Sequence, residues 1–389
     1  MRKSIFLREI NSCLDNEEIT CVAKVIHIRK LGKLQFLVIL DQTGKCQCII
    51  DNKTRMSDKI EKGSFVEITG LVATNENDRK EIQVKELAIL GVKNKETDPR
   101  NISYGKVEKL ILRSRIVELI LRFFSEKGFL PVSSPTIVGN WVEGKTHAFT
   151  IDYFGRPCYL TLNNMLYHQV LLISGFSKIY EISKVFRKDA SNPRNRLTEF
   201  FSVDISVSDK DGSYVMKTVE EMIRYVLCAL DGAQIYKDVV FDHLTYSELI
   251  NRCGCVALSG AQLNAKATQY LKENYKGFVW ITNFPEEKRR FFVKSEDGFC
   301  NDYQLWYNGE CQIAAGSERE QRLEELKRKI IQEDKRIEQY EEFLKYFENS
   351  VPPMAEIGFG LERFIMFVLG CKDISEVVAF PRNKKTFEL

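Results

Sequence analysis

The 389-residue chain lacks the features of a membrane, secreted or zinc-binding protein. No run approaches the roughly 18 apolar residues of a membrane span, and the start, MRKSIFLREINSCLDNEE, has basic residues but no apolar signal segment. No Cys/His cluster has zinc-site spacing. We therefore expect a cytoplasmic protein with no membrane partner, whose 11 cysteines are reduced thiols.

Histidine is scarce, and charge of one sign is absent. The four histidines, at positions 27, 147, 168 and 243, are scattered and form no Ser/His/Asp arrangement. The net charge is only +3, from 57 basic and 54 acidic residues. If the protein binds nucleic acid, it must therefore use a local basic surface.

The first 95 residues predict a small β-barrel. Short apolar runs are separated by turns rich in Gly, Asp and Asn, which is typical of barrels and sandwiches. These cues favour an OB-fold and a generic barrel about equally. The runs cover residues 20–25, 35–40, 46–50, 65–72 and 81–84.

Residues 106–389 predict a second domain of the α+β class. A polar segment, 96–105, carries Pro99 and is expected to be a linker. Helical periodicity follows over residues 107–127, with Gly128 as its C-cap. Strand-like and helical runs then alternate, which indicates a mainly antiparallel sheet. The charged segment 321–349 is expected to be a solvated helix.

Two constellations could bind anions. Residues 181–204 read as a hairpin with a basic loop that carries Arg187 and Arg196, and arginine matches phosphate bidentately. Near the end, Gly358 and Gly360 lead into an apolar helix carrying Arg363. A solvated hairpin and a buried, paired arginine are the alternatives.

In combination, these residues resemble motifs 2 and 3 of the class II aminoacyl-tRNA synthetases, in the aspartyl/asparaginyl/lysyl subgroup. Residues 128–135 resemble motif 1, and Phe380-Pro381-Arg382 resembles the family's ending. Residues 29–47 are similar to the anticodon-binding OB-fold. The resemblance implies an OB-fold at 1–95, a catalytic domain at 106–389, and a homodimer that uses ATP, Mg²⁺, an amino acid and tRNA.

The resemblance also implies roles for individual residues. Arg187 would grip the α-phosphate of ATP, and Arg363 would lie along the triphosphate; both would be catalytic. The remaining implied residues are Asp189, Arg196, Leu197, Phe200 and Gly360 for ATP, Glu143, His168 and Arg319 for the amino acid, and Arg29, Phe36 and Gln47 for the anticodon.

The amino acid indicated is asparagine. The pattern from Gly316-Ser317 through Arg319-Glu320 resembles the asparaginyl branch, and His168 stands where aspartyl enzymes carry a lysine. Imidazole is a poorer carboxylate clamp than ammonium. The implied reaction activates asparagine as an adenylate and transfers it to tRNA, so the protein supplies positioning and charge rather than a nucleophile.

The sequence departs from the family at the ATP site. Gln304 and Gln312 stand where carboxylates hold Mg²⁺, and amides are weaker ligands. Asp302 and Glu310 lie nearby, and Glu310 is the candidate metal ligand. Met165 replaces a glutamine, and Asn195-Arg196 replaces an Arg-His pair. Three alternatives therefore stay open: an aspartate–tRNA ligase, a paralogue using its adenylate for amide formation, and a non-catalytic tRNA-binding protein.

Overall fold

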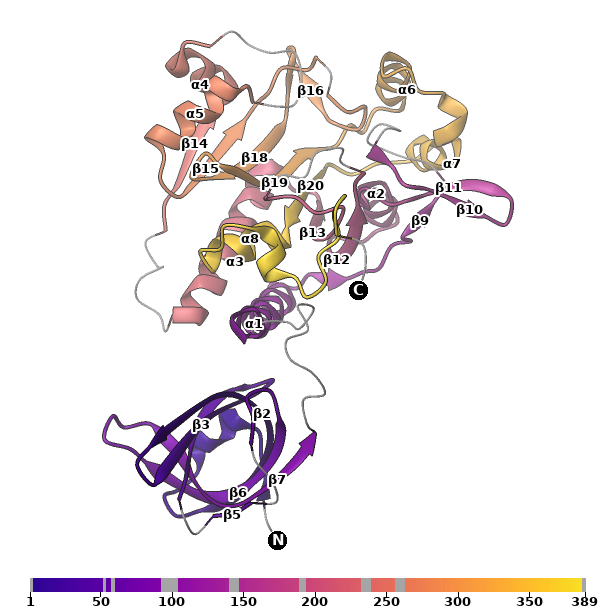
Figure 1. The fold of residues 1–389 in the computed structure, drawn as a ribbon. Helices are drawn as coiled ribbons and strands as arrows, with labels where there is room; N and C mark the ends of the chain where they lie inside the picture. The colour runs from indigo at the N-terminus through magenta and orange to yellow at the C-terminus, as the bar shows by residue number, and fades with distance from the viewer. Residues whose placement is uncertain are drawn as a thin grey trace. The chain divides into compact units, whose positions relative to one another are not determined.

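The computed structural model describes residues 3–51, 54–56, 60–91, 104–139, 147–188, 194–231, 239–255, 263–287 and 289–386. The chain forms two compact units, Met1–Leu112 and Arg113–Leu389 (Figure 1). Glu143, Asp189 and most of the predicted linker lie outside the described residues. Helix α1 begins at Tyr104, inside the predicted linker.

The first unit is a closed five-stranded barrel. Its strands are β2 (Glu18–Leu31), β3 (Leu34–Asp41), β4 (Gly44–Ile50), β6 (Phe65–Thr74) and β7 (Lys80–Gly91). They pair in the order β2-β3-β4-β7-β6, and β6 returns to pair with β2. Short elements complete this unit: β1 (Lys3–Ser4), η1 (Leu7–Ser12) and β5 (Arg55–Met56).

Buried and partly exposed residues alternate along the barrel strands, which gives the barrel an apolar interior and a more polar outer face. In β4, Cys46, Cys48 and Ile50 are buried, whereas the residues between them are partly exposed. Successive side chains of a strand point to opposite faces, so one set fills the barrel and the other faces outward. The thiols thus act as small core residues, and burial raises the pKa of Cys46 to about 12.

The second unit is built on an eight-stranded, mainly antiparallel sheet. The strand order is β14-β15-β18-β19-β20-β13-β12-β8, with parallel pairs only at the two ends. The strands are β8 (Leu130–Pro131), β12 (Lys178–Phe186), β13 (Glu199–Ser208), β14 (Phe241–Thr245), β15 (Phe278–Thr282), β18 (Asp302–Tyr307), β19 (Cys311–Glu318) and β20 (Met354–Gly360). Small sheets add β9 (Ile137–Val138), β10 (Thr150–Tyr153), β11 (Arg156–Leu160), β16 (Ser295–Glu296) and β17 (Phe299–Cys300).

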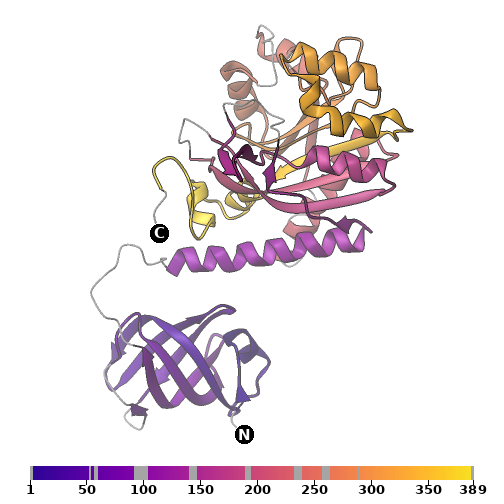
Figure 2. The same ribbon diagram turned by 90° about the vertical axis from the view of Figure 1, so that its right-hand side faces the viewer.

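Helices bury their apolar faces in three clusters around this sheet. The largest core joins one face of the central strands to α1 (Tyr104–Glu126), α3 (Gly212–Asp231), α8 (Leu361–Val368) and η5 (Ile374–Val377). A second core contains α2 (Met165–Ile173) and α6 (Leu323–Gln332), and a third contains α4 (Tyr246–Cys253) and α5 (Ala265–Asn274). Figure 2 shows the long α1 beside the sheet. None of the helices in the described ranges is long and apolar enough to cross a membrane.

The predicted helix over residues 107–127 is confirmed, including its end. Gly128 has a φ of 73°, and the Phe129 N–H donates to the Phe124 carbonyl. This left-handed residue closes the last turn of α1, a role that glycine fills without strain.

The expectation of one solvated helix over residues 321–349 is wrong. The segment breaks into α6, η3 (Ile337–Tyr340), α7 (Glu341–Leu344) and η4 (Lys345–Glu348), with Asp334 at a φ of 55° between the first two. Tyr340, Leu344 and Phe347 are buried in the second core. The chain turns after α6 because these apolar residues pack back onto the domain rather than following a single helical stripe.

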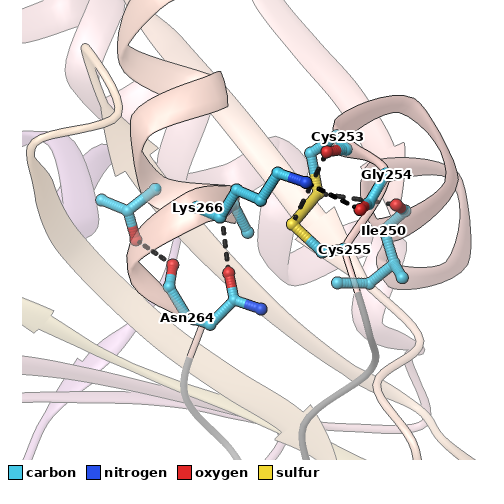
Figure 3. Close-up of a disulfide and its surroundings, with 8 residues drawn as sticks. Ile250, Cys253, Gly254, Cys255, Asn264 and Lys266 are labelled. Atoms are coloured by element: carbon cyan, nitrogen blue, oxygen red, sulfur yellow. Dashed lines mark hydrogen bonds between the residues drawn. A yellow bond between two sulfur atoms is a disulfide. The ribbon is translucent and has the colours of Figure 1, made fainter.

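One cysteine pair also differs from the sequence-based expectation. Cys253 and Cys255 form a disulfide across a single residue, with their Cα atoms 5.4 Å apart (Figure 3). Gly254 between them has a φ of 58° and is the left-handed residue that ends α4. The Lys266 ammonium donates to the Gly254 carbonyl at 2.8 Å. The other nine cysteines are free.

Candidate active site

One face of the central strands carries polar and small residues. On β13, Val203, Ile205 and Val207 belong to the largest core, so Asp204 and Ser206 project from the opposite face. The register places Asp204 beside Gly358 of β20 and Ser206 beside Glu356. Alternation thus separates an apolar face, which packs under helices, from a polar face available for ligands.

Two glycines, Gly358 and Gly360, leave space on this face of the sheet because they have no side chains. A Cβ on Gly358 would lie 3.1 Å from Asp204 Oδ1 and 3.3 Å from Met165 Cε. A Cβ on Gly360 would lie 3.3 Å from the Ile313 carbonyl oxygen. Gly358 pairs on its other side with Ala315, another small residue. The missing side chains leave a hollow over the middle of the sheet.

A pocket lies over this hollow and gathers the predicted nucleotide residues. Of the seven residues expected to contact ATP, Asp189 falls outside the described part of the chain. The other six all line the pocket: Arg187, Arg196, Leu197, Phe200, Gly360 and Arg363.

Backbone contacts hold the two predicted catalytic arginines at the pocket. Arg363 donates from Nη1 to the Gln312 carbonyl at 2.7 Å and from Nε to the Asn195 carbonyl at 3.2 Å. Arg187 follows β12, where its N–H donates to Thr198 and its guanidinium carbon lies 6.0 Å from the centre of the Phe200 ring. Both guanidiniums therefore come from segments fixed by the sheet.

The neighbouring cavity is strongly cationic. Arg187, Arg196 and Arg363 also line it, together with Arg290 and His147. Four guanidiniums around one cavity favour a polyanion, because guanidinium groups form charge-assisted hydrogen bonds with phosphate oxygens.

The residues here do not fit a Mg²⁺ ion held by the protein. Glu310 lines the cationic cavity, but its side chain is 58 % exposed and forms a 2.7 Å ion pair with Lys272. Gln304 is buried and accepts a hydrogen bond from Trp306 Nε1 at 3.2 Å. In the described ranges, no three His, Cys, Asp or Glu side chains come together as a possible metal site. Magnesium prefers carboxylate oxygens, and among the described residues that line this cavity the carboxylate, that of Glu310, is paired with Lys272.

Asp302, the other acid near the predicted metal position, is bound to residues outside the pocket. It accepts the Phe284 N–H at 3.0 Å and forms a 2.7 Å ion pair with Arg289. Both side chains are 7 % exposed, and burial raises the pKa of Asp302 to about 6. Asp302 lines neither the pocket nor the cationic cavity.

Asp204 is a pocket residue to which the sequence analysis assigned no role. It is 1 % exposed; Ser202 donates to its Oδ1 at 2.6 Å, and its Oδ2 is buried without a hydrogen-bond partner. Burial raises its pKa to about 6. An acid in the interior of β13, directly between Val203 and Ile205, was the signal that could have identified it. A buried carboxylate that lines a pocket and has one unpartnered oxygen is suited to binding a cationic group.

His168 lies behind the pocket wall rather than on it. It is fully buried on α2, with Nδ1 2.8 Å from Ser206 Oγ and Nε2 3.0 Å from Glu181 Oε2. Ser206 in turn donates to Glu356 at 2.9 Å. With Ser206 donating onward, both imidazole nitrogens must carry protons. Burial lowers the pKa of His168, but Glu181 and the nearby carboxylates outweigh it and raise the pKa above 6.5.

Arg319 is also buried and does not line the nucleotide pocket. Its Nε donates to Glu356, its Nη1 donates to Ser317 Oγ at 3.0 Å, and its Nη2 contacts Met165 Sδ. The structure therefore brings Arg319 and His168 into one buried network through Glu356. The third predicted amino-acid residue, Glu143, lies outside the described residues.

The predicted anticodon residues share the outer face of the barrel. Arg29 pairs with Phe36 across β2 and β3, and Val38 pairs with Gln47 across β3 and β4. Because Phe36 and Val38 are two residues apart, their side chains share a face. The Arg29 guanidinium carbon lies 5.5 Å from the centre of the Phe36 ring, and Gln47 donates to Glu81 at 3.0 Å. A partly exposed ring beside cations and amides can stack on unpaired bases.

Comparisons with known proteins agree with both units. The family described as tRNA synthetases class II (D, K and N) matches residues 76–384, and an OB-fold nucleic acid binding domain matches residues 19–90. An aspartate–tRNA(Asp/Asn) ligase of Methanopyrus kandleri is 29 % identical over 428 residues, covering 99 % of both chains. A ligase of the same name from Archaeoglobus fulgidus is 26 % identical and covers 98 % of both.

Solved structures share the fold over the whole chain. Asparaginyl-tRNA synthetase from Pyrococcus horikoshii, complexed with asparaginyl-adenylate, has a TM-score of 0.87 at 21 % identity and full coverage of both chains. A putative aspartyl-tRNA synthetase from Leishmania major has a TM-score of 0.78 at 19 % identity, covering 100 % of this chain and 95 % of the other. The predicted α+β fold with an N-terminal OB-fold is thereby confirmed.

Proposed function

Because the chain belongs to the class II tRNA synthetases of the D, K and N group, we propose that it activates asparagine with ATP and transfers it to tRNA. The observation that carries the proposal is one pocket that combines Arg187, Arg363 and the carboxylate of Asp204, whose Oδ2 has no hydrogen-bond partner. It offers cations for a triphosphate and an anion for an α-ammonium group.

The first step uses positioning and charge. The asparagine carboxylate attacks the α-phosphorus of ATP, pyrophosphate leaves, and asparaginyl-adenylate forms. Arg187 and Arg363 stabilise the charge that develops on the phosphoryl oxygens, while Asp204 holds the ammonium group and so orients the attacking carboxylate. In the second step a ribose hydroxyl of tRNA attacks the acyl carbon, and AMP leaves.

Mutation of the two arginines tests the assignment of the pocket. Arg187→Ala and Arg363→Ala should each lower asparagine-dependent ATP–pyrophosphate exchange by about 10³-fold, because each removes a charge-stabilising donor. Arg328→Ala is the matched control, since Arg328 lies on α6 and pairs with Glu325 at the surface. Exchange at the wild-type rate in both pocket variants would falsify the assignment.

The barrel supports tRNA as the acceptor. Arg29, Phe36 and Gln47 form a polar and aromatic surface on its outer face, which suits single-stranded bases. A ligase that used only small amines would not need this surface.

Aspartate is the second candidate substrate. Curated relatives 26–29 % identical carry the name aspartate–tRNA(Asp/Asn) ligase. Exchange assays with asparagine and aspartate in parallel, with and without total tRNA, separate the two. Exchange with aspartate alone would replace our proposal by the second candidate.

We further propose that the protein works as a homodimer. Leu121 on α1, Leu130 on β8 and Ile137 on β9 are large apolar side chains that are 41–49 % exposed. β8 is also a terminal strand of the main sheet. Exposed apolar residues beside an open sheet edge favour pairing with a second copy. Leu121→Asp should shift the sedimenting species from dimer to monomer.

The cytoplasmic location stays a prediction.

A further inference from the structure

Arg319, expected from the resemblance to contact the substrate side chain, is engaged inside the protein through all three of its nitrogens. Each of its three guanidinium nitrogens has a partner within the protein, namely Glu356, Ser317 and Met165. The Phe292 ring covers it at 4.6 Å, and its side chain is 1 % exposed. Arg319 also does not line the nucleotide pocket, so a carboxylate in that pocket would meet a guanidinium that is buried and already paired with an internal carboxylate.

Glu356 is the internal counter-charge of Arg319, and its own oxygens are also satisfied. Ser206 donates to Oε1 at 2.9 Å, and Gln169 donates to Oε2 at 3.2 Å. The side chain is fully buried. The Glu356 carboxylate is thus already ion-paired with the guanidinium that an acidic substrate side chain would need as its partner.

The buried network has no spare positive charge. Arg319 balances Glu356, and His168, protonated at both nitrogens, balances Glu181. Asp204 remains as an additional carboxylate facing the pocket. The α-ammonium of an amino acid would neutralise Asp204, but a second carboxylate on the substrate would be left uncompensated in a desolvated site, which is costly.

Met165 separates Arg319 from the pocket. Its Sδ contacts Arg319 Nη2, whereas its methyl group borders the hollow over Gly358. The Met165 side chain therefore lies between the Arg319 guanidinium and the hollow over Gly358, with its methyl group toward the hollow. Met165 also lines the pocket.

We propose that Glu356 is a specificity-determining residue: by holding Arg319 in an internal ion pair, it restricts the site to amino acids with uncharged side chains. This inference rests on the proposed function, because it takes the Asp204 pocket as the amino-acid site. It assigns aspartate exclusion to a residue that never touches the substrate.

Direct binding of the two amino acids tests the proposal. We would measure dissociation constants of asparagine and aspartate by equilibrium dialysis for wild type, Glu356→Gln and Glu356→Gln with Met165→Ala. Loss of the internal carboxylate leaves Arg319 unbalanced, so the preference for asparagine over aspartate should shrink at least about tenfold, most in the double variant. An unchanged ratio in folded variants overturns the proposal.

The matched control is Glu320→Gln. Glu320 follows Arg319 in the chain and is 1 % exposed, but its carboxylate pairs with Lys329 and Arg322, whereas Arg319 pairs with Glu356. Its replacement removes a buried carboxylate of the same kind and should leave the ratio unchanged. A shift equal to that of Glu356→Gln would mean that general loosening, and not the freed guanidinium, changes specificity.

Wild-type protein provides a measurement that does not depend on the folding of variants. Aspartate β-methyl ester, which has no side-chain charge, should compete for the asparagine site at least about tenfold better than aspartate. Equal competition overturns the role of Glu356. If the wild type binds neither amino acid, the proposed function fails, and aspartate binding gained by Glu356→Gln still decides the role of Glu356.

Discussion

Asp204→Asn should stabilise the unliganded protein at pH 7.5 and weaken its binding of asparagine. Burial raises the pKa of Asp204 from 3.8 to about 6, and the carboxylates of Glu181 and Glu356 add to this rise. His168 and the hydrogen bond from Ser202 oppose it. At about 1.4 kcal/mol per pKa unit, ionising Asp204 in the unliganded protein costs about 3 kcal/mol.

The sign of this effect is specific. Because the folded pKa of Asp204 lies above the unfolded value of 3.8, the folded protein binds more protons between 3.8 and about 6. The free energy of unfolding of the wild type therefore falls as pH rises through this window and stays lower above it. Asp204→Asn removes that dependence, so its advantage should grow from near zero at about pH 4 to about 2–3 kcal/mol above pH 6.

Substrate binding should change in the opposite direction. The ammonium group of asparagine would lose its buried carboxylate partner, which costs about 3 kcal/mol, or roughly a hundredfold in affinity. In the wild type, asparagine affinity should decline as pH falls below about 6, where Asp204 takes up a proton. The variant should lack this acidic limb.

Urea unfolding followed by tryptophan fluorescence measures the stability change. All three tryptophans, at positions 141, 280 and 306, lie in the second unit, so the signal reports on the domain that holds Asp204. Equilibrium dialysis from pH 5 to 8 measures asparagine affinity. Asp211→Asn is the contrasting control: hydrogen bonds from Ser213 and Tyr214 lower the pKa of Asp211, so its replacement should reduce stability.

Two results would contradict the reasoning. If Asp204→Asn is no more stable than the wild type at pH 7.5, burial does not impose the proposed cost on the carboxylate. If asparagine affinity is unchanged, Asp204 does not hold the ammonium group.

Three further predictions concern the barrel, the core and the cationic cavity. Phe36→Ala should lower kcat/KM for tRNA about 10- to 100-fold, because base stacking is lost, and should leave tRNA-independent pyrophosphate exchange unchanged. If both activities fall, Phe36 is needed for folding rather than for tRNA binding. Arg113→Met should destabilise the second unit by about 3 kcal/mol in urea unfolding, because it strands Glu362, which is 2 % exposed and 2.9 Å from Arg113; a loss below about 1 kcal/mol would contradict this. Glu310→Gln should change ATP affinity by less than about threefold in calorimetry with Mg²⁺, because its 2.7 Å pair with Lys272 is at the surface; a tenfold loss would support a metal ligand at this position.

Much of the fold could be predicted because the signals were local. Apolar residues at helical spacing and Gly128 specified α1, and alternation in short apolar runs specified the barrel strands. The pocket arginines were also visible, since Arg187 and Arg363 stand in recognisable motifs beside glycines and loops.

The segment at 321–349 shows where local patterns failed. Its charges predict a solvated helix, but Tyr340 and Phe347 are buried, and the chain breaks at Asp334 to bury them. Tertiary packing outweighed the local pattern because burying large aromatic side chains contributes more free energy than continuing one helix.

By itself, the sequence determined the two-domain plan and the family, and it singled out Arg187 and Arg363, which line the pocket. Only the tertiary structure decided the charge balance at the proposed amino-acid site, where Arg319 meets Glu356 and Asp204 is left with an unpartnered oxygen. The physical reason is distance along the chain. Arg319 and Glu356 are 37 residues apart, and Gln169 and Glu356 are 187 apart. Whether a charged side chain is free or neutralised depends on such partners, which only the folded sheet brings together.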